Sequence, residues 1–161
     1  MYSWRVTKYD PLYRDTDGSY FNQEEWTCFS EVGTNVSIDE DLMTEDKYLN
    51  AISAFMVEMG LNVLYINALE QWSDEVKSQH ANKLWIGKAI TAQEVLELAK
   101  MTLQNAIWCK LGVEKEFFVH FGNDYYMYIG ASKDCVKAID AVSQSGLFVE
   151  DFVSPYLAEF W

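Results

Sequence analysis

The alternation of hydrophobic and polar residues predicts several strands. Residues 2–9 alternate large apolar with polar side chains, which is the pattern of a strand with one buried face. Residues 61–67 form a short apolar run that indicates a buried strand. Residues 116–120 and 125–130 are rich in β-forming side chains, and turn-forming residues 122–124 separate them, so they predict a hairpin.

Shorter apolar runs predict two more strands, at residues 26–30 and 147–149. Residues 10–19 contain Asp-Pro and Asp-Gly turn sequences, which favour an exposed loop. Residues 70–90 mix charged and polar side chains without a clear period, and they predict an exposed loop or a frayed helix.

Two helices are predicted from apolar residues at helical spacing. The first follows Thr44, a candidate N-cap, and ends at Gly60, because glycine readily adopts the left-handed conformation that ends a helix. The second begins at Thr91, whose capping-box partner Glu94 lies three residues further on, and its apolar pattern continues to Gly112.

A third helix is expected between Ser132, a candidate N-cap, and Gly146. The chain has no internal repeat and no low-complexity segment, and its 161 residues lie within the usual size of one domain. The segments together predict a single α+β domain over residues 1–161, with about three helices and one antiparallel or mixed sheet.

The acidic charge of the chain limits the kinds of partner that it is expected to bind. It has 25 Asp and Glu against 12 Lys and Arg, a formal net charge of −13, so binding to nucleic acid or to an anionic membrane is not expected. No apolar stretch approaches the roughly 18 to 20 residues of a membrane span, and no signal peptide is recognisable. Three cysteines without paired spacing argue against a disulfide scaffold. We expect a soluble cytoplasmic protein.

Motifs for catalysis are scarce. His120 lies in an apolar run and could pair with Asp124 or with a cysteine, but a hydrogen-bonded strand histidine is the simpler interpretation. No nucleophile motif, phosphate-binding loop or zinc-ligand spacing accompanies it. We expect no catalytic residue, no metal and no cofactor; the alternative is a small cytosolic enzyme that uses His120 with a nearby carboxylate.

One loop partly matches a calcium-binding motif. Asp15, Asp17, Gly18 and Glu24 occupy the third, fifth, sixth and twelfth positions of an EF-hand loop, but Tyr13 stands where the first ligand should be. A predicted strand, not a helix, precedes this loop. A turn with solvated acids is therefore favoured, and a calcium-dependent or purely structural acidic domain is a third interpretation of the chain.

Acidic residues are concentrated near the start of the chain. Residues 1–46 contain eleven acidic and three basic residues, a net charge of −8, and aromatic residues are interspersed among them. Such a segment suits the capture of a basic protein, because charge steers the encounter and aromatic anchors supply binding energy. The alternative is an ordinary solvated surface whose aromatic residues, Trp26 above all, face the core. The candidate partner-binding residues are Tyr13, Asp15, Asp17, Tyr20, Asp39, Glu40 and Asp41.

Three sequence blocks resemble a known group of small bacterial proteins. They are YSWRVTKYDP at residues 2–11, EWTCFSEVG at 25–33 and FVHFGNDYYMYIG at 118–130. The chain resembles immunity proteins of polymorphic toxin or contact-dependent growth inhibition systems. The resemblance implies a non-enzymatic inhibitor that binds a cognate toxin domain, often a nuclease and therefore expected to be basic, but it assigns no individual binding residue.

Overall fold

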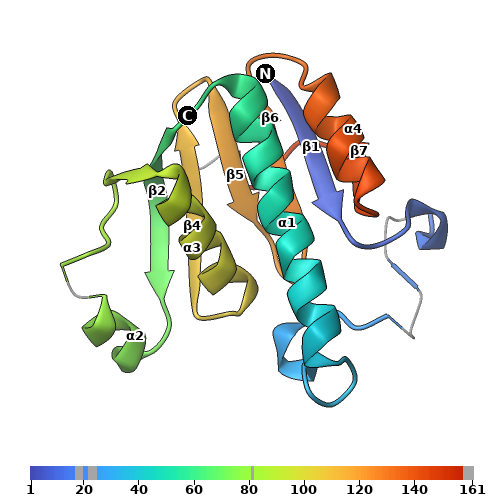
Figure 1. Cartoon of the computed structure of the whole chain (residues 1–161), viewed down its shortest axis with the longest axis horizontal. Coiled ribbons are helices and arrows are strands. Elements are labelled where there is room, and N and C mark those ends of the chain that lie inside the picture. The colour runs from blue at the N-terminus through green and yellow to red at the C-terminus, as the bar shows by residue number, and fades with distance from the viewer. Residues whose placement is uncertain (17–19, 22–24, 81, 158–161) are drawn as a thin grey trace.

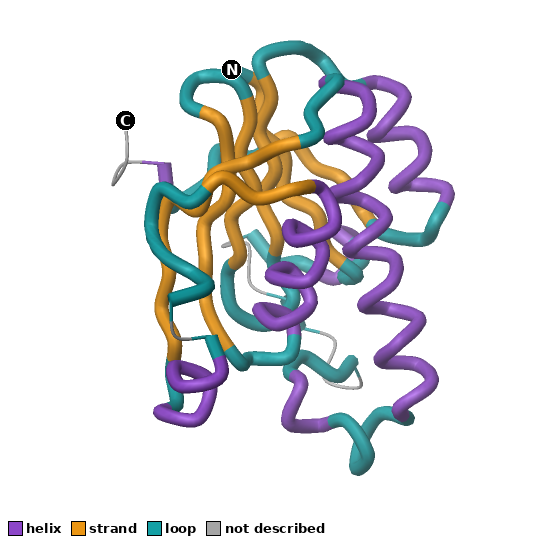
Figure 2. The backbone as a smooth tube through the Cα atoms, turned by 60° about the vertical axis from the view of Figure 1, so that its left-hand side comes forward, coloured by secondary structure: helices purple, strands orange, loops and turns teal. Residues whose placement is uncertain are grey.

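The residues that the structure describes form one antiparallel sheet with three helices packed on one face (Figure 1 and Figure 2). The structure is a computed structural model, and it describes residues 1–16, 20–21, 25–80 and 82–157. The strand order is β3-β2-β4-β5-β6-β1-β7. The strands are β1 (Tyr2–Thr7), β2 (Val63–Gln71), β3 (Ala89–Thr91), β4 (Ile107–Val113), β5 (Phe117–Phe121), β6 (Met127–Ala131) and β7 (Phe148–Asp151).

The helices are α1 (Ile38–Met59), α2 (Asp74–Gln79), α3 (Ala92–Leu103) and α4 (Val136–Gln144). Figure 2 shows α1, α3 and α4 together on one side of the sheet, whereas the short α2 lies apart from them after β2. Two 3-10 turns, Pro11–Tyr13 and Phe29–Glu31, lie in the long connection between β1 and α1. None of the described helices is long and apolar enough to cross a membrane. The α+β class and the antiparallel sheet are thus confirmed.

The main core lies between the sheet and these three helices. Every second residue of the central strands points into it, as the alternation of a half-buried strand requires. Phe55 of α1 packs against Trp4 of β1, with ring centroids 5.3 Å apart. The fully buried core side chains of the sheet include Val6, Leu64, Ile66, Ile107, Leu111, Phe117, Val119 and Ile129.

The opposite face of the sheet is covered in part by the C-terminal segment, residues 152–157. Phe152 and Tyr156 lie over Tyr128 of β6, with ring centroids 5.8 and 5.9 Å away. The indole of Trp108 in β4 meets Tyr156 edge to face, at 5.9 Å. Because this segment covers that face, polar side chains of the central strands such as Lys110, His120 and Tyr128 are buried as well.

Several predicted elements are confirmed in position. The alternating start of the chain is β1, and the hairpin is β5 and β6. The capping box is present at α3, where the Thr91 hydroxyl accepts from the Glu94 amide at 3.3 Å and the Glu94 carboxylate accepts from the Thr91 amide at 2.8 Å. Gly60 ends α1 in the left-handed conformation, with φ of 71°.

The second predicted helix was extended too far. α3 ends at Leu103, because Asn105 adopts a left-handed conformation with φ of 56° and Ala106 donates to the Met101 carbonyl. Ile107 and the alternating residues after it form β4, which pairs with both β2 and β5. A short apolar run of this kind is compatible with either a helix or a strand, and here its pairing with β2 and β5 makes it a strand.

Other boundaries also differ from the sequence expectation. α1 begins at Ile38 with Ser37 as its N-cap, not after Thr44, and Cys135 rather than Ser132 is the N-cap residue of α4. Residues 26–30 contain no strand, although Trp26 is buried as expected. Residues 70–90 contain the end of β2, the helix α2 and the start of β3.

Candidate functional site

The first two turns of α1 reverse the usual distribution of side chains. Ile38, Leu42 and Met43 are 61%, 43% and 64% exposed, whereas the acids Asp41 and Glu45 are only 3% and 2% exposed. A helix that packs on a protein normally buries its apolar side chains and leaves its carboxylates in water. This half of α1 therefore presents apolar side chains that the fold itself does not use.

The two buried acids have partners inside the molecule. The Tyr125 hydroxyl donates to Asp41 Oδ1 at 2.9 Å, and the Gln104 amide donates to Glu45 Oε2 at 2.7 Å. Lys100 forms an ion pair with Glu45 at 3.0 Å. Burial raises the pKa of the Asp41 carboxyl, and repulsion from Glu45 adds to this effect, while the Tyr125 hydrogen bond and Lys100 oppose it. These contacts connect α1 to the β5–β6 turn and to the end of α3.

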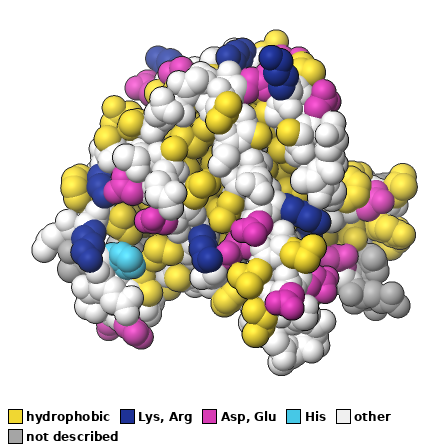
Figure 3. All heavy atoms as spheres, in the orientation of Figure 1, with side chains coloured by type: hydrophobic (Ala, Val, Ile, Leu, Met, Phe, Trp, Pro, Cys, Tyr) yellow, Lys and Arg dark blue, Asp and Glu magenta, His cyan; other side chains and the backbone are white. Residues whose placement is uncertain are grey.

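Acids that face solvent surround the exposed apolar residues. Asp39 and Glu40 lie in the first turn of α1 and are exposed, and so is Asp46 one to two turns later. Figure 3 shows acidic and hydrophobic side chains interspersed over the start of α1, at the lower right of the view. We call this surface the α1 patch; it consists of Ile38, Asp39, Glu40, Leu42, Met43 and Asp46.

A hollow of about 390 Å³ borders the α1 patch. Asp39, Glu40 and Met43 form one side of it, and Glu25 and Trp26 form another. Lys8 lies in the hollow, where it pairs with Glu25 and its ammonium lies 4.0 Å from the centre of the Trp26 ring. Burial lowers the pKa of Lys8, and the neighbouring carboxylates oppose this. The α1 patch thus combines protruding apolar side chains with a concave, charged margin.

The residues predicted to bind a partner lie in two places. Asp39 and Glu40 belong to the α1 patch. Tyr13 is exposed on the 3-10 turn Pro11–Tyr13, which Figure 1 places on the right-hand side, away from the start of α1. Asp15 is exposed beside that turn, and Tyr20 is half-buried, with its ring 4.8 Å from that of Tyr9.

Two members of the predicted set need separate mention. Asp41 is buried against Tyr125, so it does not belong to the surface that the sequence suggested. Because α1 begins at Ile38 and not after Thr44, Asp41 lies on its inward face, where its carboxylate accepts from the Tyr125 hydroxyl. Asp17 lies outside the described residues, as do Gly18 and Glu24 of the partial calcium motif. Within the described part of the chain, no three His, Cys, Asp or Glu side chains are placed to hold a metal ion.

Sequence reasoning missed the apolar members of the α1 patch. Counting back from Tyr48 at helical spacing reaches Glu45 and Asp41, not Leu42 and Met43. The signal was therefore available: apolar residues lie out of phase with the buried face of the same helix. It was hidden because the helix was expected to start only after these residues.

His120 has the surroundings of a structural residue. Its Nδ1 atom lies 2.9 Å from the Ser154 hydroxyl, and its ring stacks on Phe118 with centroids 4.3 Å apart. Burial, with a smaller contribution from nearby Lys110, lowers the pKa of His120 to about 3. No carboxylate of the described residues forms a hydrogen bond or an ion pair with it. The carboxylate that the enzyme alternative requires is therefore not seen beside His120.

Comparisons with known proteins add nothing to this geometry. No protein-family model, no curated protein and no solved structure matches the chain.

Proposed function

We propose that the protein binds a basic partner protein through the α1 patch. In the form that the resemblance to immunity proteins implies, the partner is a cognate toxin domain that the protein neutralises in the cytoplasm. The observation that carries the proposal is the reversed first half of α1, where Leu42 and Met43 face water while Asp41 and Glu45 are buried. Departures from the usual pattern of a helix are expected at functional sites.

The composition of the α1 patch suits a protein partner. Interfaces commonly combine an apolar centre with a polar rim, and a few buried side chains supply most of the binding energy. Leu42 and Met43 provide the apolar centre, and Asp39 and Glu40 provide the rim. Methionine is well suited to such a surface because its flexible side chain adapts to the partner.

The net charge of −13 supports a basic partner. Complementary charge raises association rates, and a toxin domain that acts on nucleic acid requires a basic surface of its own. An acidic inhibitor can cover that surface directly or can bind elsewhere on the toxin domain. The enzyme alternative has no comparable support, since His120 is buried and lacks an acidic partner among the described residues.

A growth assay tests this proposal. The protein is co-expressed with candidate basic toxin domains, beginning with any that a neighbouring gene encodes, and we expect the wild type to restore growth against its cognate domain. The double variant Asp39→Lys/Glu40→Lys should lose protection, because it reverses the rim charge that meets the basic partner. Glu97→Lys/Asp140→Lys, which reverses two exposed acids on α3 and α4, is the control matched in net charge and should protect. Undiminished protection by the double variant would contradict the proposal.

Binding kinetics separate the roles of the rim and the centre. Asp39→Asn with Glu40→Gln should slow association and flatten its dependence on salt, because exposed charges act mainly on the encounter. Leu42→Ala with Met43→Ala should instead speed dissociation, because buried apolar contacts hold the complex together. Surface plasmon resonance at low and high salt measures both rates. Unchanged kinetics in both variants would show that the α1 patch is only a solvated surface.

A further inference from the structure

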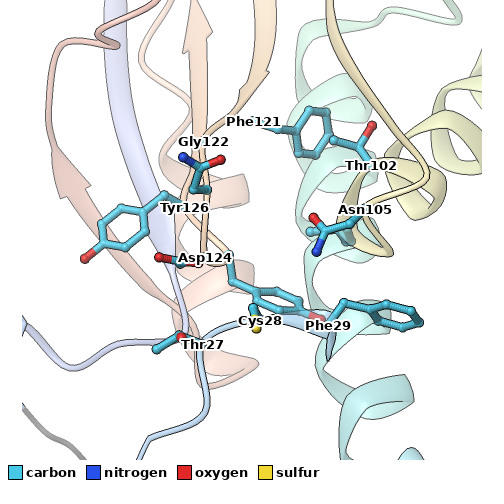
Figure 4. A pocket seen from close by; sticks show the side chains of 12 residues that line it. Thr27, Cys28, Phe29, Thr102, Asn105, Phe121, Gly122, Asp124 and Tyr126 are labelled. Atoms are coloured by element: carbon cyan, nitrogen blue, oxygen red, sulfur yellow. The ribbon is translucent and has the colours of Figure 1, made fainter. Parts of the chain in front are cut away.

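A second concave site lies at the turn between β5 and β6. It is a cavity of about 250 Å³ between this turn, the end of α3 and residues 27–29. Figure 4 shows Tyr126 and Asp124 on one side of the cavity and Phe29 and Asn105 on the other. This volume is below the 300 to 1,000 Å³ typical of sites for drug-sized ligands, so the cavity suits a single side chain better than a cofactor.

The walls of the cavity offer acceptors and aromatic faces but no cation. The residues that line it include Asp124, Asn105, Asn123 and Thr27, and neither lysine nor arginine is among them. The Asp124 carboxylate forms no hydrogen bond or ion pair with the rest of the described chain. A carboxylate, amide oxygens and aromatic rings are together the environment that binds a guanidinium or an ammonium group.

The turn that carries Asp124 is held rigidly in an uncommon conformation. Asp124 and Tyr125 both adopt left-handed backbone angles, with φ of 57° and 62°. The Tyr9 hydroxyl donates to the Asp124 carbonyl and the Tyr48 hydroxyl to the Tyr125 carbonyl, each at 2.6 Å. Two successive left-handed residues are what a two-residue hairpin turn requires, and the Tyr126 amide closes this turn on the Asn123 carbonyl at 3.1 Å. The backbone at Asp124 is thereby held in one conformation, and its exposed carboxylate stands at the mouth of the cavity.

The cavity adjoins the surface already proposed to bind a partner. Glu25 and Trp26 line the hollow beside the α1 patch, and the next three residues, 27–29, line the cavity. The Tyr125 hydroxyl also connects the turn directly to Asp41 of α1. A protein seated on the α1 patch would therefore extend over the same end of the molecule as the cavity.

We infer that the cavity at the β5–β6 turn receives one arginine or lysine side chain of the basic partner. Asp124 pairs with its charge, the amide oxygens of Asn105 and Asn123 accept from its N–H groups, and Phe29 contacts its aliphatic part. The inference rests on the proposed function, since it names the kind of residue that the partner contributes. It adds a specific contact to a surface otherwise described only by charge and apolarity.

A small probe tests the cavity without the partner. N-acetyl-arginine amide is titrated into the labelled protein and followed by NMR, with N-acetyl-citrulline amide as its uncharged counterpart of nearly equal shape. We expect shift changes at Thr27, Asn105 and Asp124 with an affinity on the order of millimolar for the arginine probe. The citrulline probe should bind roughly tenfold more weakly, because it lacks the charge that Asp124 pairs with.

Two variants test whether Asp124 is responsible for the binding of the arginine probe. Asp124→Asn keeps a residue that tolerates the left-handed conformation, so the turn should persist while arginine binding falls roughly tenfold. Asp140→Asn removes an exposed acid on α4 and should leave binding unchanged. Equal binding of the two probes, or arginine binding unaffected by Asp124→Asn, would overturn the inference. Because the probe bypasses the α1 patch, such a result would leave the growth assay as a separate test of the proposed function.

Discussion

The two halves of α1 use opposite arrangements of the same kinds of residue. In the second half, Tyr48, Ile52 and Phe55 are buried in the core, as the helical spacing predicts. In the first half, Asp41 and Glu45 occupy the equivalent inward positions, and Leu42 and Met43 face solvent. One continuous helix therefore changes from a structural element to a candidate binding element along its length.

This contrast shows how a surface can be both apolar and compatible with folding. The inward acids do not remain unpaired: Asp41 accepts from Tyr125, and Glu45 pairs with Lys100 and Gln104. Buried polar groups with partners position one element on another, although they add little net stability. The first half of α1 is thus fixed in place by polar contacts, which leaves its apolar residues available to a partner.

The largest effect is expected in the second half. Phe55→Ala removes a fully buried ring that packs on Trp4, and we expect the free energy of unfolding to fall by about 3 to 5 kcal/mol. Val57→Ala on the same helix is the control, because Val57 is exposed, and its change should stay within about 0.5 kcal/mol. Urea denaturation followed by circular dichroism measures both. If Phe55→Ala lowered the free energy of unfolding only slightly, the second half of α1 would not have the structural role that distinguishes it from the first half.

In the first half of α1, Asp41 should make the stability of the protein depend on pH. Burial raises the pKa of Asp41 in the folded state, so the folded protein binds more protons than the unfolded chain between its ordinary pKa and the raised one. The contribution of Asp41 to stability therefore decreases as the pH rises through this window, which begins near pH 4. Asp41→Asn removes the titration and keeps an acceptor for Tyr125.

The measurement is the stability of the wild type relative to Asp41→Asn, obtained by urea denaturation at several pH values from 4 to 7. We expect the difference to shift in favour of the variant as the pH increases. Asp39→Asn is the matched control, because it removes one charge from the same turn of α1 at an exposed position. A difference that stays constant, or that shifts toward the wild type, would contradict a buried Asp41 with a raised pKa.

The main elements of the fold were predictable because their signals are local. The alternation in β1, the hairpin turn between β5 and β6 and the capping box of α3 each lie within a few neighbouring residues. β4 was not predicted, because its apolar run continues the helical pattern of α3 and only pairing with β2 and β5 makes it a strand. The pairing of strands that are distant in the sequence cannot be deduced from the spacing of apolar residues along one segment.

The candidate site was predictable only in part, for a similar reason. Charge density pointed to Asp39 and Glu40, which do lie on the α1 patch. Whether Asp41 faces water or the interior depends on the phase of α1 and on Tyr125, which is 84 residues away in the sequence. The cavity at Asp124 likewise depends on Phe29, Asn105 and Tyr126 coming together from three separate segments.

The smallest effect on stability is expected for the residues that we assign to binding. Leu42→Ala with Met43→Ala removes exposed side chains that the core does not use, and alanine is at least as good a helix former. The free energy of unfolding should therefore change by less than about 0.5 kcal/mol per substitution, in contrast to Phe55→Ala. Urea denaturation measures this change in the free energy of unfolding under the same conditions as for the other variants. A loss comparable to that of Phe55→Ala would mean that Leu42 and Met43 belong to the core, and both halves of α1 would then serve the fold.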